Sequence, residues 1–232
     1  MNILVNGSSM SRGAGSWPYY LQEITKCTLT NLALGLSGNK YIHNSTITEL
    51  SLRKYDIVLI MWATVGRIDM QVEDITQFAD SKSTSVYQSA QNDWPTKVIH
   101  PINDQDYVQK NWIFSHNRDF SKEDSVSTLL RPLHTHTKQA QYMYIESDLI
   151  KMISLQSVLK SLNTPYLFMF WSDFHKFDRF THLYNMIDWT NVYTDHTLES
   201  IGKKNNWYQK DKIHFNEQAN EAYAKLIATR IT

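Results

Sequence analysis

Three short segments rich in apolar residues lie in the first quarter of the chain, at residues 3–5, 29–34 and 57–61. The last is continuous and apolar, which is typical of a strand that helices cover on both faces. The two intervening segments are each long enough for a helix. Strands that alternate with helices in this way predict a parallel sheet with right-handed crossovers.

The first helix is predicted to begin near Ser16, because serine is a preferred N-cap and Pro18 is tolerated in a first helical turn. A second helix is expected from the glycine-containing turn at 35–39 to about Leu52. The apolar residues of the first helix recur at helical spacing and predict its buried face: Trp17, Tyr20, Leu21 and Ile24.

Regular patterning returns in the second half of the chain. It predicts a long helix over 138–162, a strand over 166–170 and a last helix after Asn216. We find no internal repeat and no linker, so we expect one domain over 1–232, built as a three-layer α/β/α sandwich with a parallel sheet. The apolar face of the last helix is predicted to comprise Ala219, Ala222, Tyr223, Leu226 and Ile227.

The segment at about 64–137 is different, because it is polar and interrupted by Pro95, Pro101 and Pro132. We expect short helices and long loops there, inserted over one end of the sheet. Long ordered loops in compact domains often form lids or substrate walls. A plain surface insertion is the alternative, and the sequence leaves both open.

Charge and composition exclude several classes of protein. Lys plus Arg and Asp plus Glu number 23 each, and this balance argues against nucleic acid as a partner. No apolar run approaches the roughly 18 residues of a membrane span, and no signal peptide is recognisable. With Cys27 as the single cysteine, no internal disulfide can form. We therefore expect a cytoplasmic location, or a place in a virion if a phage encodes the protein.

Candidate chemistry lies just after the predicted strands, where parallel sheets hold their reacting groups. Ser9 follows the first strand in a tight turn, and Gly38 follows the second. Near the C-terminus, Asp211 and His214 directly precede the last helix. An imidazole held by a carboxylate can take a serine proton, and turn amides can bind the resulting oxyanion. Each of these segments alone is more typical of ordinary turn or helix-end chemistry.

Taken together and in order, the segments resemble the SGNH (GDSL-type) hydrolases. Residues 7–11, Gly-Ser-Ser-Met-Ser, are similar to that family's first block, and 37–39, Ser-Gly-Asn, to its second. Residues 211–214, Asp-Lys-Ile-His, are similar to its last block. The resemblance implies a flavodoxin-like fold and a catalytic triad of Ser9, His214 and Asp211. It also implies an oxyanion hole that includes the amides of Ser9 and Gly38.

A narrower resemblance concerns SGNH proteins found in phage genomes and surface-polysaccharide gene clusters. The segments at 16–18, 31–35 and 62–67 carry it. One departure stands out, because Thr64 occupies the place of the asparagine that the family contributes to its oxyanion hole. Either Thr64 substitutes, or another group such as Arg67 contributes, or activity is weak.

Other polar residues are candidates for substrate binding rather than catalysis. Asp173 and His175 follow the strand at 166–170, and we expect them to line the pocket. A triad that uses His175 instead of His214 is a less favoured alternative. His134 and His136 could share one face of a strand, but two ligands do not make a metal site. We expect neither a metal nor a cofactor.

The sequence thus predicts a serine esterase or deacetylase that acts on a small-molecule or glycan ester, with an acylated carbohydrate favoured. The alternative is a non-catalytic glycan-binding or structural module with the same fold. Transfer of the acyl group to another acceptor would use the same residues. The oligomeric state stays open.

Overall fold

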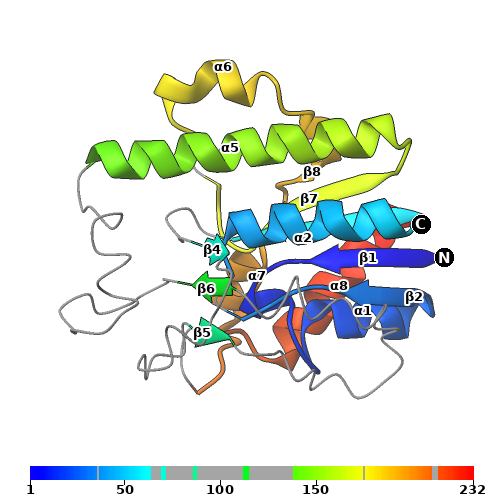
Figure 1. Ribbon diagram of the computed structural model, residues 1–232. Coiled ribbons are helices and arrows are strands. Elements are labelled where there is room, and N and C mark those ends of the chain that lie inside the picture. The colour runs from blue at the N-terminus through cyan, green and yellow to red at the C-terminus, as the bar shows by residue number, and fades with distance from the viewer. Residues whose placement is uncertain are drawn as a thin grey trace.

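A five-stranded sheet forms the centre of the computed structural model (Figure 1). Its spatial order is β2-β1-β3-β7-β8, and every neighbouring pair is parallel. The strands are β1 (Asn2–Asn6), β2 (Thr28–Asn31), β3 (Ile57–Trp62), β7 (Tyr166–Phe170) and β8 (Val192–Tyr193). The structure describes residues 1–35, 37–63, 69–71, 86–87, 112–114, 138–174, 176–210 and 214–232.

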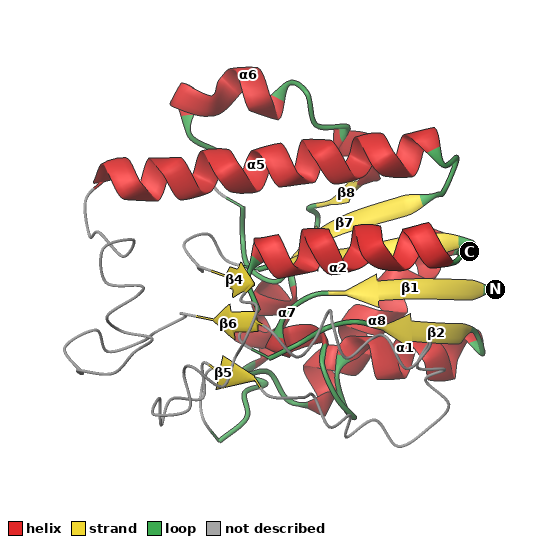
Figure 2. Ribbon diagram, viewed as in Figure 1, coloured by secondary structure: helices red, strands yellow, loops and turns green. Residues whose placement is uncertain are grey.

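Helices cover both faces of this sheet (Figure 2). One face carries α1 (Trp17–Thr25), α7 (Leu198–Asn205) and α8 (Glu217–Ile231), and the other carries α2 (Asn39–Leu52) and α5 (Lys138–Ser161). A short helix, α6 (Thr181–Tyr184), lies on the outer side of α5. Three 3-10 turns are also described: η1 (Ser9–Ser11), η3 (Asp178–Phe180) and η4 (Trp189–Asn191). The three-layer α/β/α architecture is therefore confirmed.

Two hydrophobic clusters explain this layering, because side chains of successive strand residues point to opposite faces. In β3, Val58 and Ile60 pack toward α2 and α5, whereas Leu59 and Met61 pack toward α1 and α8. All four side chains are buried. The uninterrupted apolar run at 57–61 follows from this two-sided burial.

Helix ends follow the local signals in the sequence. Ser16 occupies the N-cap of α1 in extended conformation, and Pro18 lies in the first turn. The side chain of Asn216 caps α8 by accepting a hydrogen bond from the amide of Ala219 at 3.2 Å. The side chain of Thr197 caps α7 in the same way through the amide of Ser200.

A second, antiparallel sheet of three short strands lies near the carboxyl ends of β1 and β3 (Figure 1). It consists of β4 (Asp69–Gln71), β6 (Trp112–Phe114) and β5 (Val86–Tyr87), in that spatial order. Its strands come from the polar segment at 64–137, where short helices and loops were expected. The remainder of that segment lies outside the described residues.

Several boundaries differ from the sequence-based prediction. The second strand ends at Asn31 instead of Leu34, because the chain turns there toward α2. Ile24 was assigned to the apolar face of the first helix but is 41% exposed. None of the described helices is both long enough and apolar enough to cross a membrane.

Candidate active site

The turn after β1 is built around Asn6 and Gly7. The Asn6 side chain donates to Thr46 Oγ1 at 2.9 Å and accepts from the Gly7 amide at 2.8 Å, so it fixes the direction in which the chain leaves the strand. A Cβ on Gly7 would lie 3.1 Å from the Met61 carbonyl oxygen and still closer to Ser11 Oγ. This position therefore has room for glycine alone.

Among the serines of this turn, Ser9 has the accessible hydroxyl. Ser8 and Ser11 are 1% and 0% exposed, whereas Ser9 is half-buried. Ser11 Oγ accepts from the Trp17 indole N–H at 3.0 Å, so its role is structural. Among the described residues, the Ser9 hydroxyl makes no hydrogen bond. Ser9 is thus the serine of this turn that a substrate can reach.

The turn after β2 places Gly38 at the N-cap of α2. Its amide donates to Asp69 Oδ1 at 2.8 Å, and the amide of Tyr41 donates to Asp69 Oδ2 at 2.9 Å. A carboxylate is stabilised at a helix N-terminus, both by such amides and by the helix dipole. Asp69 is 6% exposed and was not identified from the sequence. In this structure, the expected oxyanion donor Gly38 is therefore engaged by a side chain of β4.

The same turn is joined directly to the turn that carries Ser9. Ser37 Oγ donates to the Gly7 carbonyl oxygen at 3.1 Å, and the Leu34 amide approaches that oxygen at 3.3 Å. Gly7 lies two residues before Ser9, so Ser9 and Gly38 occupy adjoining turns at one edge of the sheet. This arrangement was expected from the carboxyl ends of neighbouring parallel strands.

His214 lies three residues before the first residue of α8. Its neighbour Phe215 forms an isolated antiparallel bridge with Tyr208. The carbonyl oxygen of His214 accepts from the Gln209 amide at 2.8 Å. Phe215 packs so closely on Gly202 of α7 that a Cβ there would overlap its ring. The half-buried His214 is therefore held by its backbone and by its neighbour Phe215.

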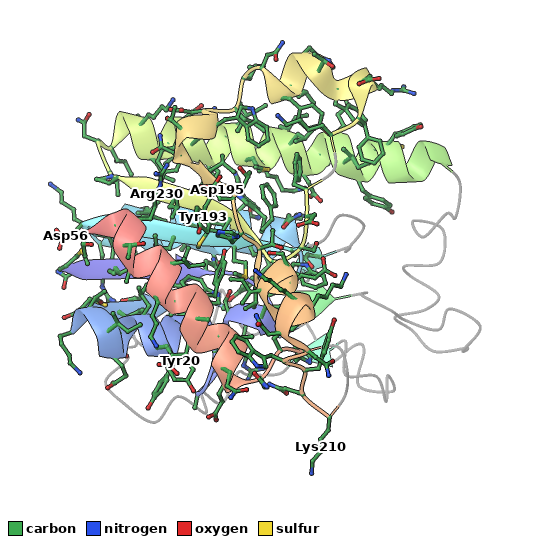
Figure 3. All side chains as sticks on the ribbon, turned by 180° about the vertical axis from the view of Figure 1, so that it is seen from behind. Tyr20, Asp56, Tyr193, Asp195, Lys210 and Arg230 are labelled. Atoms are coloured by element: carbon green, nitrogen blue, oxygen red, sulfur yellow. The ribbon has the colours of Figure 1, made fainter. Side chains whose placement is uncertain are left out.

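Contacts between α1 and α8 join the helices that follow Ser9 and His214 in the chain. The Trp17 amide donates to Asn220 Oδ1 at 3.0 Å. Trp17 follows Ser9 by eight residues, and Asn220 follows His214 by six. The Trp17 and Tyr223 rings also meet edge to face. Lys210 lies four residues before His214, and Asp56 directly precedes β3. Figure 3 shows these two residues at opposite ends of the sheet. Between the described side chains of Ser9 and His214 there is no hydrogen bond.

The other predicted site residues divide into two groups. Asp173 follows β7, as expected, but it is exposed and accepts from the Thr197 hydroxyl at 3.2 Å. It therefore contacts the N-cap of α7. Four predicted residues lie outside the described part of the chain, and the structure does not place them: Thr64, Arg67, His175 and Asp211.

A second serine–histidine pair occurs on the opposite face of the sheet. His43 Nε2 lies 3.2 Å from Ser154 Oγ, and His43 Nδ1 lies 2.9 Å from Asn44 Oδ1. Burial lowers the pKa of His43, which favours a neutral ring. Both residues lie inside helices, however, whose amides are committed to backbone hydrogen bonds. Without nearby donors for an oxyanion, this pair is a contact between α2 and α5.

Metal ligation has no support in the described residues, which contain no cluster of three or more histidine, cysteine or acidic side chains suited to an ion. His134 and His136, which we considered as partial ligands, lie outside the described part.

Comparisons with known proteins establish the fold. No family profile matches the chain, and no curated protein matches its sequence. Among solved structures, TesA is 9% identical with a TM-score of 0.52, covering 100% of this chain and 98% of TesA. Axe2, an acetylxylan esterase from Geobacillus stearothermophilus, is 12% identical with a TM-score of 0.50, covering 99% and 93%. The chain therefore shares its three-layer α/β/α fold with TesA and Axe2.

Proposed function

We propose that the protein is a serine ester hydrolase of the SGNH type, with Ser9 as nucleophile and His214 as general base. The observation that carries the proposal is the pairing of α1 with α8 through Trp17 and Asn220. This pairing supports the proposal, because it joins the helix that follows the accessible Ser9 to the helix that follows His214. Asp211 is proposed to orient the histidine.

The reaction would proceed in two steps through an acyl-enzyme. His214 takes the hydroxyl proton of Ser9 as its oxygen attacks the ester carbonyl, and then gives that proton to the leaving alcohol. In the second step, His214 takes a proton from water, and the hydroxide attacks the acyl group. The bond to Ser9 then breaks, and Ser9 regains its proton from His214.

Stabilisation of the oxyanion is assigned to the amides of Ser9 and Gly38, with Thr64 as a third donor. The Gly38 amide bonds Asp69 here, so it can join only when the substrate oxygen replaces that carboxylate. One missing oxyanion donor costs on the order of 2.7–4 kcal/mol in the barrier. The exchange between Asp69 and substrate would therefore affect the rate directly.

An acylated carbohydrate is the proposed substrate class. The structural neighbour Axe2 is described as an acetylxylan esterase, which agrees with this proposal. Arg67, Asp173 and His175 are proposed to contact the substrate, and tryptophans near the predicted loops suit the faces of sugar rings. A phage or polysaccharide-cluster setting remains part of the proposal.

Hydrolysis of p-nitrophenyl acetate tests the reaction. Ser9→Ala and His214→Ala are expected to reduce kcat on the order of 10³-fold or more, because the two residues act as a unit. Ser154→Ala and His43→Ala are matched controls, since they remove the hydrogen-bonded serine–histidine contact between α2 and α5, and they are expected to retain wild-type kcat. Equal hydrolysis by Ser9→Ala and wild type would exclude Ser9 as the nucleophile.

A non-catalytic glycan-binding module is the second candidate. It is favoured by the engagement of the Gly38 amide with Asp69 and by Thr64 at the place of the family's asparagine. Such a module would bind an acetylated oligosaccharide without releasing acetate, and Ser9→Ala would leave its affinity unchanged. Calorimetry combined with an acetate assay distinguishes the two functions.

A further inference from the structure

A buried polar network joins the end of β3 to the start of α2. Asn39, the first residue of α2, accepts from the Ala63 amide at 2.8 Å and donates to the Ala63 carbonyl oxygen at 3.2 Å. Its side-chain nitrogen also donates to Asp148 Oδ2 of α5 at 2.8 Å. Asn39, Ala63 and Asp148 are all at most 9% exposed. We call these three residues the Asn39 latch.

Asp148 determines which way the Asn39 amide points. In the observed orientation, the oxygen of Asn39 faces the Ala63 N–H and its nitrogen faces both the Ala63 carbonyl oxygen and the Asp148 carboxylate. The flipped orientation would set oxygen against carboxylate and N–H against N–H, which is unfavourable in a buried site. Lys151 Nζ lies 3.0 Å from Asp148 Oδ1 and balances the buried charge.

The latch connects to the candidate active site through the peptide chain itself. Asn39 directly follows Gly38, and Ser37 on the other side of Gly38 donates to the carbonyl oxygen of Gly7. Movement of Asn39 would therefore change the position of the Gly38 amide relative to the turn that carries Ser9. Misplacement by about 1 Å can cost on the order of 10²-fold in rate.

We propose that Asn39 and Asp148 are positioning residues of the proposed reaction, which hold the Gly38 amide at its working distance from Ser9. This inference rests on the proposed ester hydrolysis. Neither residue contacts the substrate. Their effect is therefore expected in kcat, where the oxyanion donors act, and not in KM.

The experiment compares three variants by p-nitrophenyl acetate kinetics, with the folded fraction measured by urea denaturation. Asn39→Ala and Asp148→Ala are expected to lower kcat roughly 10- to 100-fold at unchanged KM. Asp148→Asn can still accept from Asn39 through its amide oxygen while Lys151 turns to solvent. This conservative variant is therefore expected to keep kcat within about threefold of wild type.

Gln156→Ala is the matched control for stability, because Gln156 is a buried polar residue of the same helix. It donates to the Met186 carbonyl oxygen and accepts from the Asp188 amide, away from the candidate site. We expect it to be destabilised yet fully active. Wild-type kcat in folded Asn39→Ala and Asp148→Ala, or an equal loss in Gln156→Ala, would overturn the inference. Absence of Ser9-dependent turnover in wild type would instead overturn the proposed function, and this inference with it.

Discussion

Two buried carboxylates act on the first turn of α2, and they differ in what they bind. Asp69 accepts hydrogen bonds from backbone amides, and its partner Gly38 is 31 residues away in the sequence. Asp148 accepts a hydrogen bond from the side chain of Asn39, which is 109 residues away. Neither contact could be predicted from the sequence, because its partners meet only after folding. The place of Ser9 in a turn after β1 could be predicted, since a turn after a short apolar run is a local pattern, whereas its catalytic role stays a prediction.

Replacement of Asp69 tests its role at the helix start. Asp69→Ala would leave the amides of Gly38 and Tyr41 without this acceptor, and the buried donors would lose a charge-assisted bond. We expect a loss of about 1–3 kcal/mol in the free energy of unfolding, measured by urea denaturation. Asp69→Asn keeps one acceptor oxygen and should lose less. Unchanged stability in Asp69→Ala would mean that water replaces the carboxylate at no cost.

Among the elements, the long periodic helices and the buried strands could be predicted closely. The strand at 166–170 and the helix expected over 138–162 agree with β7 and α5 within a residue. The two-residue strand β8 was missed, because so short an edge strand has no periodicity to detect. The three short strands within 64–137 were missed for the same reason.

The contact between α7 and the segment before α8 is a test at this scale. Gly202→Ala would place a methyl group inside the ring of Phe215, which is 2% exposed and has little room to move. We expect a loss of about 1–3 kcal/mol in stability from overpacking. We also expect a lower kcat, because His214 directly precedes the displaced ring.

The neighbouring variant Lys203→Ala is the control for Gly202→Ala. It removes a surface ion pair with Glu199 and should leave stability close to that of wild type, because solvent screens such pairs. Wild-type stability and turnover in Gly202→Ala would show that the packing around Phe215 is looser than the structure indicates.

For the whole molecule, the strand order brings distant segments to one edge of the sheet. The parallel order β2-β1-β3-β7-β8 places the turns after β1, β2, β3 and β7 at the same edge. The small antiparallel sheet lies near that edge as well and contributes Asp69 to it (Figure 1). The sequence predicted the parallel sheet, but not that the insertion would bind the expected oxyanion donor. That contact depends on pairing between remote residues.

Locating a fluorophosphonate adduct by peptide mass spectrometry tests most directly whether Ser9 and His214 act as a catalytic pair. We expect one adduct, on the peptide that contains Ser9, and none in Ser9→Ala or His214→Ala. Ser154→Ala should be labelled like wild type. A folded wild-type protein without an adduct, or an adduct on Ser154 that survives in Ser9→Ala, would contradict the assignment of Ser9 and His214 as the catalytic pair.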